Sequence, residues 1–166
     1  YEPIIRASAG LGRLSGEPDP DSYDKRFLHC DVLIIGSGPS GIAAALAAGR
    51  AGTRVILADE DFQLGGRLNS ETYSVSGETG ANFVSEALTE LESIDNVQLM
   101  PRTTVYGVYD HGIYGALERK TDHLPSSGDG PRQILWRVYA KRSILCAGAT
   151  ERPIAFGNND RPGVML

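Results

Sequence analysis

The chain has 166 residues, 41% of them hydrophobic and 22% charged, with a formal net charge of -5. This length and apolar content suffice for one ordinary domain with a buried core. The acidic balance, without any run of basic residues, argues against a nucleic acid or an anionic membrane as a partner. The longest apolar stretch is too short to span a bilayer, and the first residues lack the pattern of a signal peptide.

Residues 1–29 are predicted to form an extended lead-in segment, followed by a nucleotide-binding domain over residues 30–166. Pro3 favours a short helical turn that ends by Gly10, whereas Pro18 and Pro20 favour an extended chain.

A glycine turn follows the apolar strand predicted over residues 32–35. Gly36 permits a sharp turn, Gly38 leaves room for a pyrophosphate against bare backbone, and Gly41 lets the next helix pack closely on the sheet. Pro39 suits the first position of that helix. A helix N-terminus offers free N–H groups and a favourable dipole, so the pattern predicts that a dinucleotide binds here.

Asp59 ends the next predicted strand, residues 55–58, where a carboxylate commonly accepts hydrogen bonds from an adenosine ribose. Glu60 and Asp61 follow, and three consecutive acids repel the 2′-phosphate of NADP. NAD and FAD therefore remain. The alternative is a structural turn with a solvated acidic loop.

A second glycine turn contains Gly65, Gly66 and Arg67, and its backbone either approaches the cofactor or forms a simple loop. No cysteine pair follows it, which disfavours disulfide exchange. The spacing of apolar residues predicts a helix over residues 79–94, and a short strand follows at residues 97–100.

Three antiparallel strands are predicted over residues 104–109, 113–119 and 133–140, with a flexible loop over residues 120–131. His111 lies between the first two strands, which indicates a turn residue rather than a ligand or base. His29 and His123 have no partner at metal-ligand spacing, so no metal site is predicted.

A final strand is predicted over residues 143–146. If it lies beside the strand at residues 32–35, Gly148 faces the cofactor crevice. Cys30 and Cys146 are the only cysteines and are expected to be buried thiols, although a disulfide between them stays open. Two thiols favour a reducing cytoplasm as the location.

This order of elements resembles the first nucleotide domain of the flavoproteins that have two dinucleotide-binding domains. The resemblance implies a glutathione-reductase-like α/β fold: a Rossmann-like three-layer domain in which a parallel sheet is joined by a three-stranded antiparallel meander. Two further stretches resemble the alpha-subunit family of heterotetrameric sarcosine oxidases. The residues that carry this resemblance are Tyr1, Glu2, Pro3, Ile4, Ile5, Arg6, Ala9, Gly10, Leu11, Gly12, Pro18, Asp19, Pro20, Asp21 and Tyr23 near the start, and Glu151, Arg152, Pro153, Asn159, Asp160, Arg161, Pro162, Gly163, Val164, Met165 and Leu166 near the end.

The resemblance implies oxidative demethylation of sarcosine to glycine with hydrogen peroxide, and transfer of the one-carbon unit to tetrahydrofolate. It further implies that this domain binds NAD, that FAD belongs to the beta subunit, that FMN lies at their interface, and that gamma and delta subunits complete the assembly. No catalytic residue is then expected in this chain. The residues alone favour FAD, whereas the family resemblance favours NAD.

Carried over position by position, the family pattern gives a set of expected cofactor-binding residues. They are Gly36, Gly38, Pro39, Ser40, Gly41, Asp59, Glu60, Gly65, Gly66, Arg67, Val105, Ala147 and Gly148. One departure is visible at the end of the set. Where relatives commonly have Ala-Thr-Gly, this chain has Cys146, Ala147 and Gly148, so a hydroxyl is lost and the glycine is kept.

Two other functions stay open. One is an alpha-like subunit of an opine, proline or cyanide-forming dehydrogenase, and the other is a non-catalytic scaffold in which the nucleotide stabilises subunit assembly.

The chain begins with Tyr1 and ends with the apolar residues Val164, Met165 and Leu166, which indicates a piece of a longer polypeptide. We expect this piece to have marginal stability by itself, because missing strands and helices would cover part of its core. Thermal unfolding of the 166-residue chain followed by circular dichroism checks this expectation. Cooperative unfolding at an ordinary midpoint would contradict it.

Overall fold

The structure is a computed structural model that describes residues 1–10, 16–72, 74–75, 77–125, 128, 130–149 and 154–163. Leu11, Gly12, Ser126, Ser127, Asp129, Glu151, Arg152, Pro153, Val164, Met165 and Leu166, on which some of the sequence-based expectations fall, lie outside the described residues. The helices are α1 (Glu2–Ser8), α2 (Pro39–Arg50) and α3 (Gly80–Ser93), with short 3-10 turns η1 (Gly66–Asn69) and η2 (Asp110–Gly112). The strands are β1 (Tyr23–Ile35), β2 (Val55–Ala58), β3 (Ser74–Val75), β4 (Glu78–Thr79), β5 (Val97–Met100), β6 (Thr103–Tyr109), β7 (Ile113–Glu118) and β8 (Gln133–Leu145).

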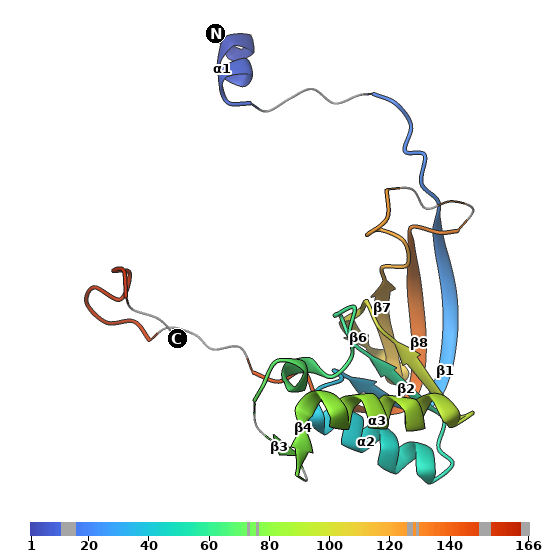
Figure 1. The fold of residues 1–166 in the computed structure, drawn as a ribbon. Coiled ribbons are helices and arrows are strands. Elements are labelled where there is room, and N and C mark those ends of the chain that lie inside the picture. The colour runs from blue at the N-terminus through green and yellow to red at the C-terminus, as the bar shows by residue number, and fades with distance from the viewer. Residues whose placement is uncertain are drawn as a thin grey trace.

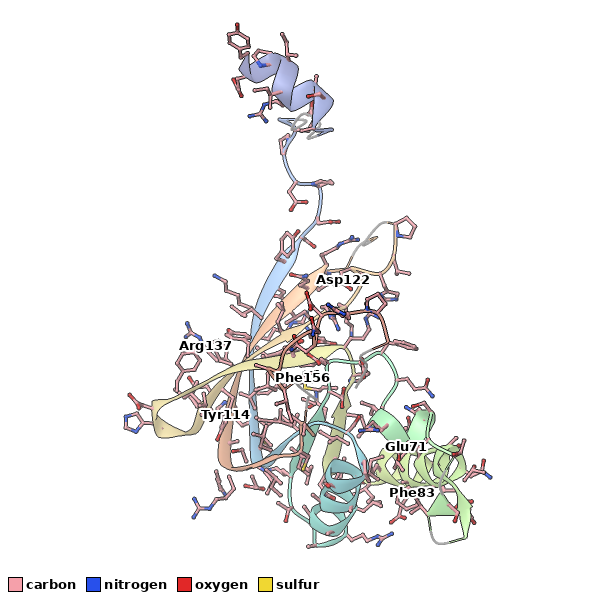
Figure 2. All side chains as sticks on the ribbon, turned by 90° about the vertical axis from the view of Figure 1, so that its left-hand side faces the viewer. Glu71, Phe83, Tyr114, Asp122, Arg137 and Phe156 are labelled. Atoms are coloured by element: carbon pink, nitrogen blue, oxygen red, sulfur yellow. The ribbon has the colours of Figure 1, made fainter. Side chains whose placement is uncertain are left out.

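Six strands form one mixed sheet in the order β5-β2-β1-β8-β7-β6. The four strands β5, β2, β1 and β8 are parallel, whereas β6, β7 and β8 form an antiparallel meander. Helices α2 and α3 lie side by side against the parallel strands (Figure 1). Figure 2 shows Phe83 of α3 on the helical side of the molecule, and Tyr114 of β7 and Arg137 of β8 on the opposite side. The predicted α/β class with a parallel sheet and a meander is confirmed.

Strand β2, together with Leu33 and Ile34 of β1, is buried on both faces, as strands of parallel sheets usually are. Leu33 and Ile56 belong to a core that also contains Trp136 and Val138 of β8. The next residues along these strands, including Ile34, point the other way and pack against α2 and α3. The alternation of side chains along a strand therefore places one hydrophobic core on each side of the sheet.

Strand β1 begins at Tyr23, seven positions before the predicted domain boundary at residue 30. Its first half pairs in parallel with β8, from Tyr23 opposite Gln133 to Cys30 opposite Ala140. The predicted boundary at residue 30 thus lies inside strand β1. The residues of this first half are mostly exposed and do not alternate between apolar and polar side chains. Their partner strand lies more than a hundred positions further along the chain, so local sequence did not indicate the pairing.

The strands predicted over residues 133–140 and 143–146 are one continuous strand, β8. Its second half lies beside β1, with Ile35 opposite Leu145, so the condition under which Gly148 was expected to face the crevice is met. His111 lies in the η2 turn between β6 and β7 with a φ of 61°, which confirms its expected place in a turn. The small hairpin of β3 and β4 was not predicted.

Asp31 lies in β1 just before the residue at which β2 begins to pair with this strand. Its side chain bonds to Arg54, which precedes β2, and to Lys141 of β8. Its carboxylate accepts hydrogen bonds from the Arg54 guanidinium at 3.0 Å and lies 2.8 Å from Lys141 Nζ. The hydrogen bonds from Arg54, and then that from Lys141, lower the pKa of Asp31 well below its ordinary value. A carboxyl group with a lowered native pKa stabilises the fold when it is ionised.

Replacing Asp31 by Asn is therefore expected to lower the melting temperature of the chain at pH 7. The contribution of Asp31 is present above the unfolded-state pKa of about 4 and is lost as the pH falls towards its lower native pKa. The melting temperatures of wild type and variant, measured from pH 7 down to pH 3, should consequently converge. The exposed Asp95, for which no ion pair is described, supplies the control D95N, which should run parallel to wild type.

Candidate dinucleotide-binding site

A cleft of about 810 Å³ opens at the carboxyl ends of the parallel strands. Ile35 of β1, Ala58 of β2 and Leu145 of β8 form its base, and the start of α2 forms one wall. Open α/β sheets bind their ligands at this edge, in the crevice outside the carboxyl ends of the strands.

The N-terminus of α2 faces the cleft without a capping side chain. Gly38 is the N-cap residue and Pro39 the first helical residue, and no side chain accepts a hydrogen bond from the N–H groups of the first turn. A Cβ atom added at Gly38 would meet no protein atom within 4 Å. The first turn therefore offers backbone donors to open space, which is the arrangement that binds a phosphate group.

Gly36 and Gly41 hold the start of α2 tightly against the ends of β1 and β8. Gly36 has a φ of 101°, and a Cβ atom there would lie 2.4 Å from the carbonyl oxygen of Cys146. A Cβ atom on Gly41 would lie 1.9 Å from the carbonyl oxygen of Gly36. Only glycine fits at either position.

Ser37 is the functional residue of the turn that the sequence analysis missed. It is fully buried. Its hydroxyl donates to Asp59 Oδ2 at 2.6 Å and accepts from the backbone N–H of Gly65 at 3.0 Å. Its own N–H also donates to Asp59 Oδ2. This Ser37 junction joins the two glycine turns to the acidic loop, and the sequence could not show it because only burial distinguishes Ser37 from an exposed turn serine.

The acidic loop consists of Asp59, Glu60 and Asp61, all of which line the cleft. Both carboxylate oxygens of Asp59 already accept protein hydrogen bonds, since Oδ1 accepts from the N–H of Asp61 at 2.9 Å. Glu60 is exposed, and no hydrogen bond to its carboxylate is described. Glu60 is thus the better placed of the two predicted acids to accept a hydrogen bond from a ribose hydroxyl.

The structure brings most of the predicted cofactor-binding residues together around this cleft. Those that line it are Gly36, Gly38, Pro39, Ser40, Asp59, Glu60, Gly66, Arg67, Val105, Ala147 and Gly148. Gly41 and Gly65 do not line it. Gly41 supports the contact with Gly36, and Gly65 has a φ of 123° and donates its N–H to Ser37.

Several further residues line the cleft that the sequence analysis did not select. They are Asp61, Leu68, Glu71, Thr103, Thr104, Cys146 and Ala149, together with the strand ends that form its base. Arg67 is the basic residue among the lining side chains, and it forms an ion pair with Glu71 at 2.9 Å. Because carboxylates outnumber this arginine, an anionic ligand depends on the backbone donors of α2.

Both cysteines are free thiols. Burial raises the pKa of Cys30, which lies in the core beneath the sheet, to about 11, and it also raises the pKa of Cys146. A raised pKa keeps a thiol protonated and unreactive at neutral pH. Within the described ranges, no group of three or more His, Cys, Asp or Glu residues could hold a metal ion, and no helix is long and apolar enough to cross a membrane.

The chain is similar to several known proteins. Residues 31–110 match the family described as FAD dependent oxidoreductase. The whole chain is 51% identical to sarcosine oxidase subunit alpha of Rhizobium meliloti (strain 1021), and 95% of it is 42% identical to sarcosine oxidase subunit alpha of Corynebacterium sp. (strain P-1). The chain spans only 17% and 16% of the lengths of these two relatives.

Among solved structures, L-proline dehydrogenase from P. horikoshii superposes with a TM-score of 0.62 at 28% identity, over 90% of this chain and 28% of that one. The expected resemblance to the sarcosine oxidase alpha-subunit family is confirmed.

The Ser37 junction generates a direct test. Replacing Ser37 by Ala leaves the buried N–H of Gly65 without its acceptor, so the chain should lose about 1–3 kcal/mol of stability in urea denaturation. Dinucleotide affinity should fall as well, because the Ser37 hydroxyl no longer joins Asp59 to the Gly65–Gly66 turn through its two hydrogen bonds. The matched control is Ser70→Ala, since the hydroxyl of Ser70 also bonds to backbone but Ser70 is exposed, whereas Ser37 is buried. Equal stability losses in both variants would contradict the role given to Ser37.

Proposed function

Starting from this relationship to the sarcosine oxidase alpha subunits, which extends over the whole chain, we propose that the chain is the dinucleotide-binding part of an oxidoreductase subunit. One observation carries the proposal. The uncapped N-terminus of α2, the glycine turn and the acidic loop meet in a single cleft at the carboxyl edge of the sheet.

Each part of the cleft suits one part of the ligand. The pyrophosphate accepts hydrogen bonds from the first turn of α2, above Gly38 and Ser40. The adenosine ribose donates to the carboxylates of the acidic loop, Glu60 foremost. The adenine lies towards Val105, and the remainder of the cofactor extends past Gly66 and Gly148.

NAD and FAD share the ADP half that these residues contact. The match to FAD dependent oxidoreductases favours FAD, whereas the resemblance to the alpha subunits of sarcosine oxidase implies NAD. The cofactor supplies a redox-active ring when it is bound, and the chain's own residues bind and orient it.

For the whole protein we propose the reaction that the resemblance implies. Sarcosine is oxidatively demethylated to glycine with formation of hydrogen peroxide, and the one-carbon unit passes to tetrahydrofolate. Beta, gamma and delta subunits are the proposed partners, with a further FAD, FMN and folate bound outside this chain, in a cytoplasmic complex. The 51% identity over the entire chain supports this choice over an opine, proline or cyanide-forming dehydrogenase.

Purification of the full-length subunit followed by denaturation identifies the cofactor. A released compound that absorbs near 450 nm is a flavin and supports FAD, whereas a released compound with only the adenine absorption band, converted by a dehydrogenase to NADH, supports NAD. Release of neither compound would overturn the dinucleotide proposal. Reduction of the bound cofactor by sarcosine in the assembled complex separates a redox role from a non-catalytic scaffold.

Gly36 provides a second test of the cleft. Gly36→Ala combines a left-handed φ, which costs a non-glycine residue about 1–2 kcal/mol, with a clash against the Cys146 carbonyl, so dinucleotide binding should be lost. Gly52→Ala has a comparable positive φ of 77° and nothing within 4 Å of the added Cβ atom. The Gly52 variant should therefore be mildly destabilised and still bind, as measured by isothermal titration with ADP. Unchanged ADP affinity in Gly36→Ala would argue against binding at this turn.

A further inference from the structure

The backbone of the acidic loop is bound by residues at the start of β6 and just after the end of β7. The carbonyl oxygen of Asp59 accepts from the N–H of Thr103 at 2.7 Å, and that of Asp61 accepts from the N–H of Arg102 at 2.8 Å. The carbonyl oxygen of Glu60 accepts from Nη2 of Arg119, just beyond the end of β7. All three consecutive carbonyls of the loop are thus bound by the meander.

Arg119 differs from the other two donors because it acts through its side chain. Thr103 and Arg102 donate backbone N–H groups, which every residue type except proline provides. Arg119 donates from its guanidinium group, so the hold on Glu60 depends on the identity of residue 119. The backbone of Arg119 is itself fixed, because its carbonyl accepts from Nε of Arg102 at 3.0 Å and its N–H donates to the Arg102 carbonyl at 2.9 Å.

The surroundings of Arg119 are unusual for a structural arginine. Its Nε is buried without a hydrogen-bond partner among the described residues. The neighbouring Arg102 forms an ion pair with Asp122 at 2.7 Å, whereas none of the described ion pairs includes Arg119. The Arg119 residue is half-buried with its Nε atom buried, and the hydrogen bond described for its guanidinium goes to one loop carbonyl, so this side chain acts chiefly on the position of that loop.

We propose that Arg119 is a positioning residue for recognition of the adenosine ribose. It fixes the Glu60 backbone through the carbonyl oxygen, and thereby holds the Glu60 carboxylate where it can accept a hydrogen bond from the 2′-hydroxyl of the ribose. Arg119 does not line the cleft and contacts no part of the ligand. The inference rests on the proposed dinucleotide site. It adds to that site the residue that sets its preference for a ribose with a 2′-hydroxyl.

The test compares ADP with 2′-deoxy-ADP, because the ratio of their affinities reports the hydrogen bond to the 2′-hydroxyl alone. In the full-length protein freed of its cofactor, wild type should bind ADP about tenfold more tightly than 2′-deoxy-ADP. Arg119→Met should reduce this preference to about twofold or less. Arg119→Lys retains a side-chain donor for the carbonyl of Glu60, so this variant should keep most of the preference for ADP.

Controls distinguish positioning from general damage. Arg50→Met removes an exposed arginine that pairs with Glu90 at the far end of α2, and its ratio should equal that of wild type. Glu60→Ala, which removes the acceptor, should lower the ratio as Arg119→Met does, and the two effects should not add in the double variant, as expected for residues that act through one another.

The outcomes are separable. If wild type does not bind ADP, the proposed function fails. If wild type binds ADP with the expected preference and Arg119→Met leaves the preference unchanged, the inference about Arg119 is overturned while the site stands. Should Arg119→Met fail to fold, Arg119→Gln, which keeps a polar but shorter side chain, takes its place. A ratio in Arg119→Gln equal to that of wild type would contradict the proposal.

Discussion

The structure depends on the close contact of three backbone segments at the carboxyl edge of the sheet. The end of β1, the start of α2 and the end of β8 approach so closely that a Cβ atom on Gly36 or Gly41 would overlap a carbonyl oxygen. This contact aims the first turn of α2 at the cleft and brings Cys146, Ala147 and Gly148 beside it. Without it, the helix would lie further from the sheet and its N–H groups would not meet a ligand seated on the strand ends.

The same contact supplies the donors that the proposed anionic ligand requires in an acidic protein. The chain carries a net charge of -5, and the cleft itself contains Asp59, Glu60, Asp61 and Glu71 against Arg67. Backbone N–H groups at a helix N-terminus supply donors without a charged side chain. The Ser37 junction binds the Asp59 carboxylate beside the start of α2, which leaves Glu60 and Asp61 as the exposed carboxylates of the loop.

The meander has two roles in this arrangement. Its inner face, with Ala116, Ile134, Trp136 and Val138, covers one side of the parallel sheet and completes a core. Its strand ends bind the carbonyls of the acidic loop, through Arg102, Thr103 and the Arg119 guanidinium. A layer that buries apolar surface therefore also fixes the backbone of the acidic loop.

Local sequence determined the elements that depend on short-range physics. The glycine turn, the start of α2 at Pro39, the buried strands and the turn at His111 follow from backbone conformational preferences and from apolar periodicity within about fifteen residues, and the order of these elements indicated the fold. Tertiary structure decided what depends on contacts between distant segments. The pairing of Tyr23–Cys30 with β8, the burial of Ser37 between two loops, and the hold of Arg119 on Glu60 join residues that lie between 22 and more than 100 positions apart. A hydrogen bond of this kind exists only once the chain is folded, since its partners have no local signal that distinguishes them from other serines and arginines.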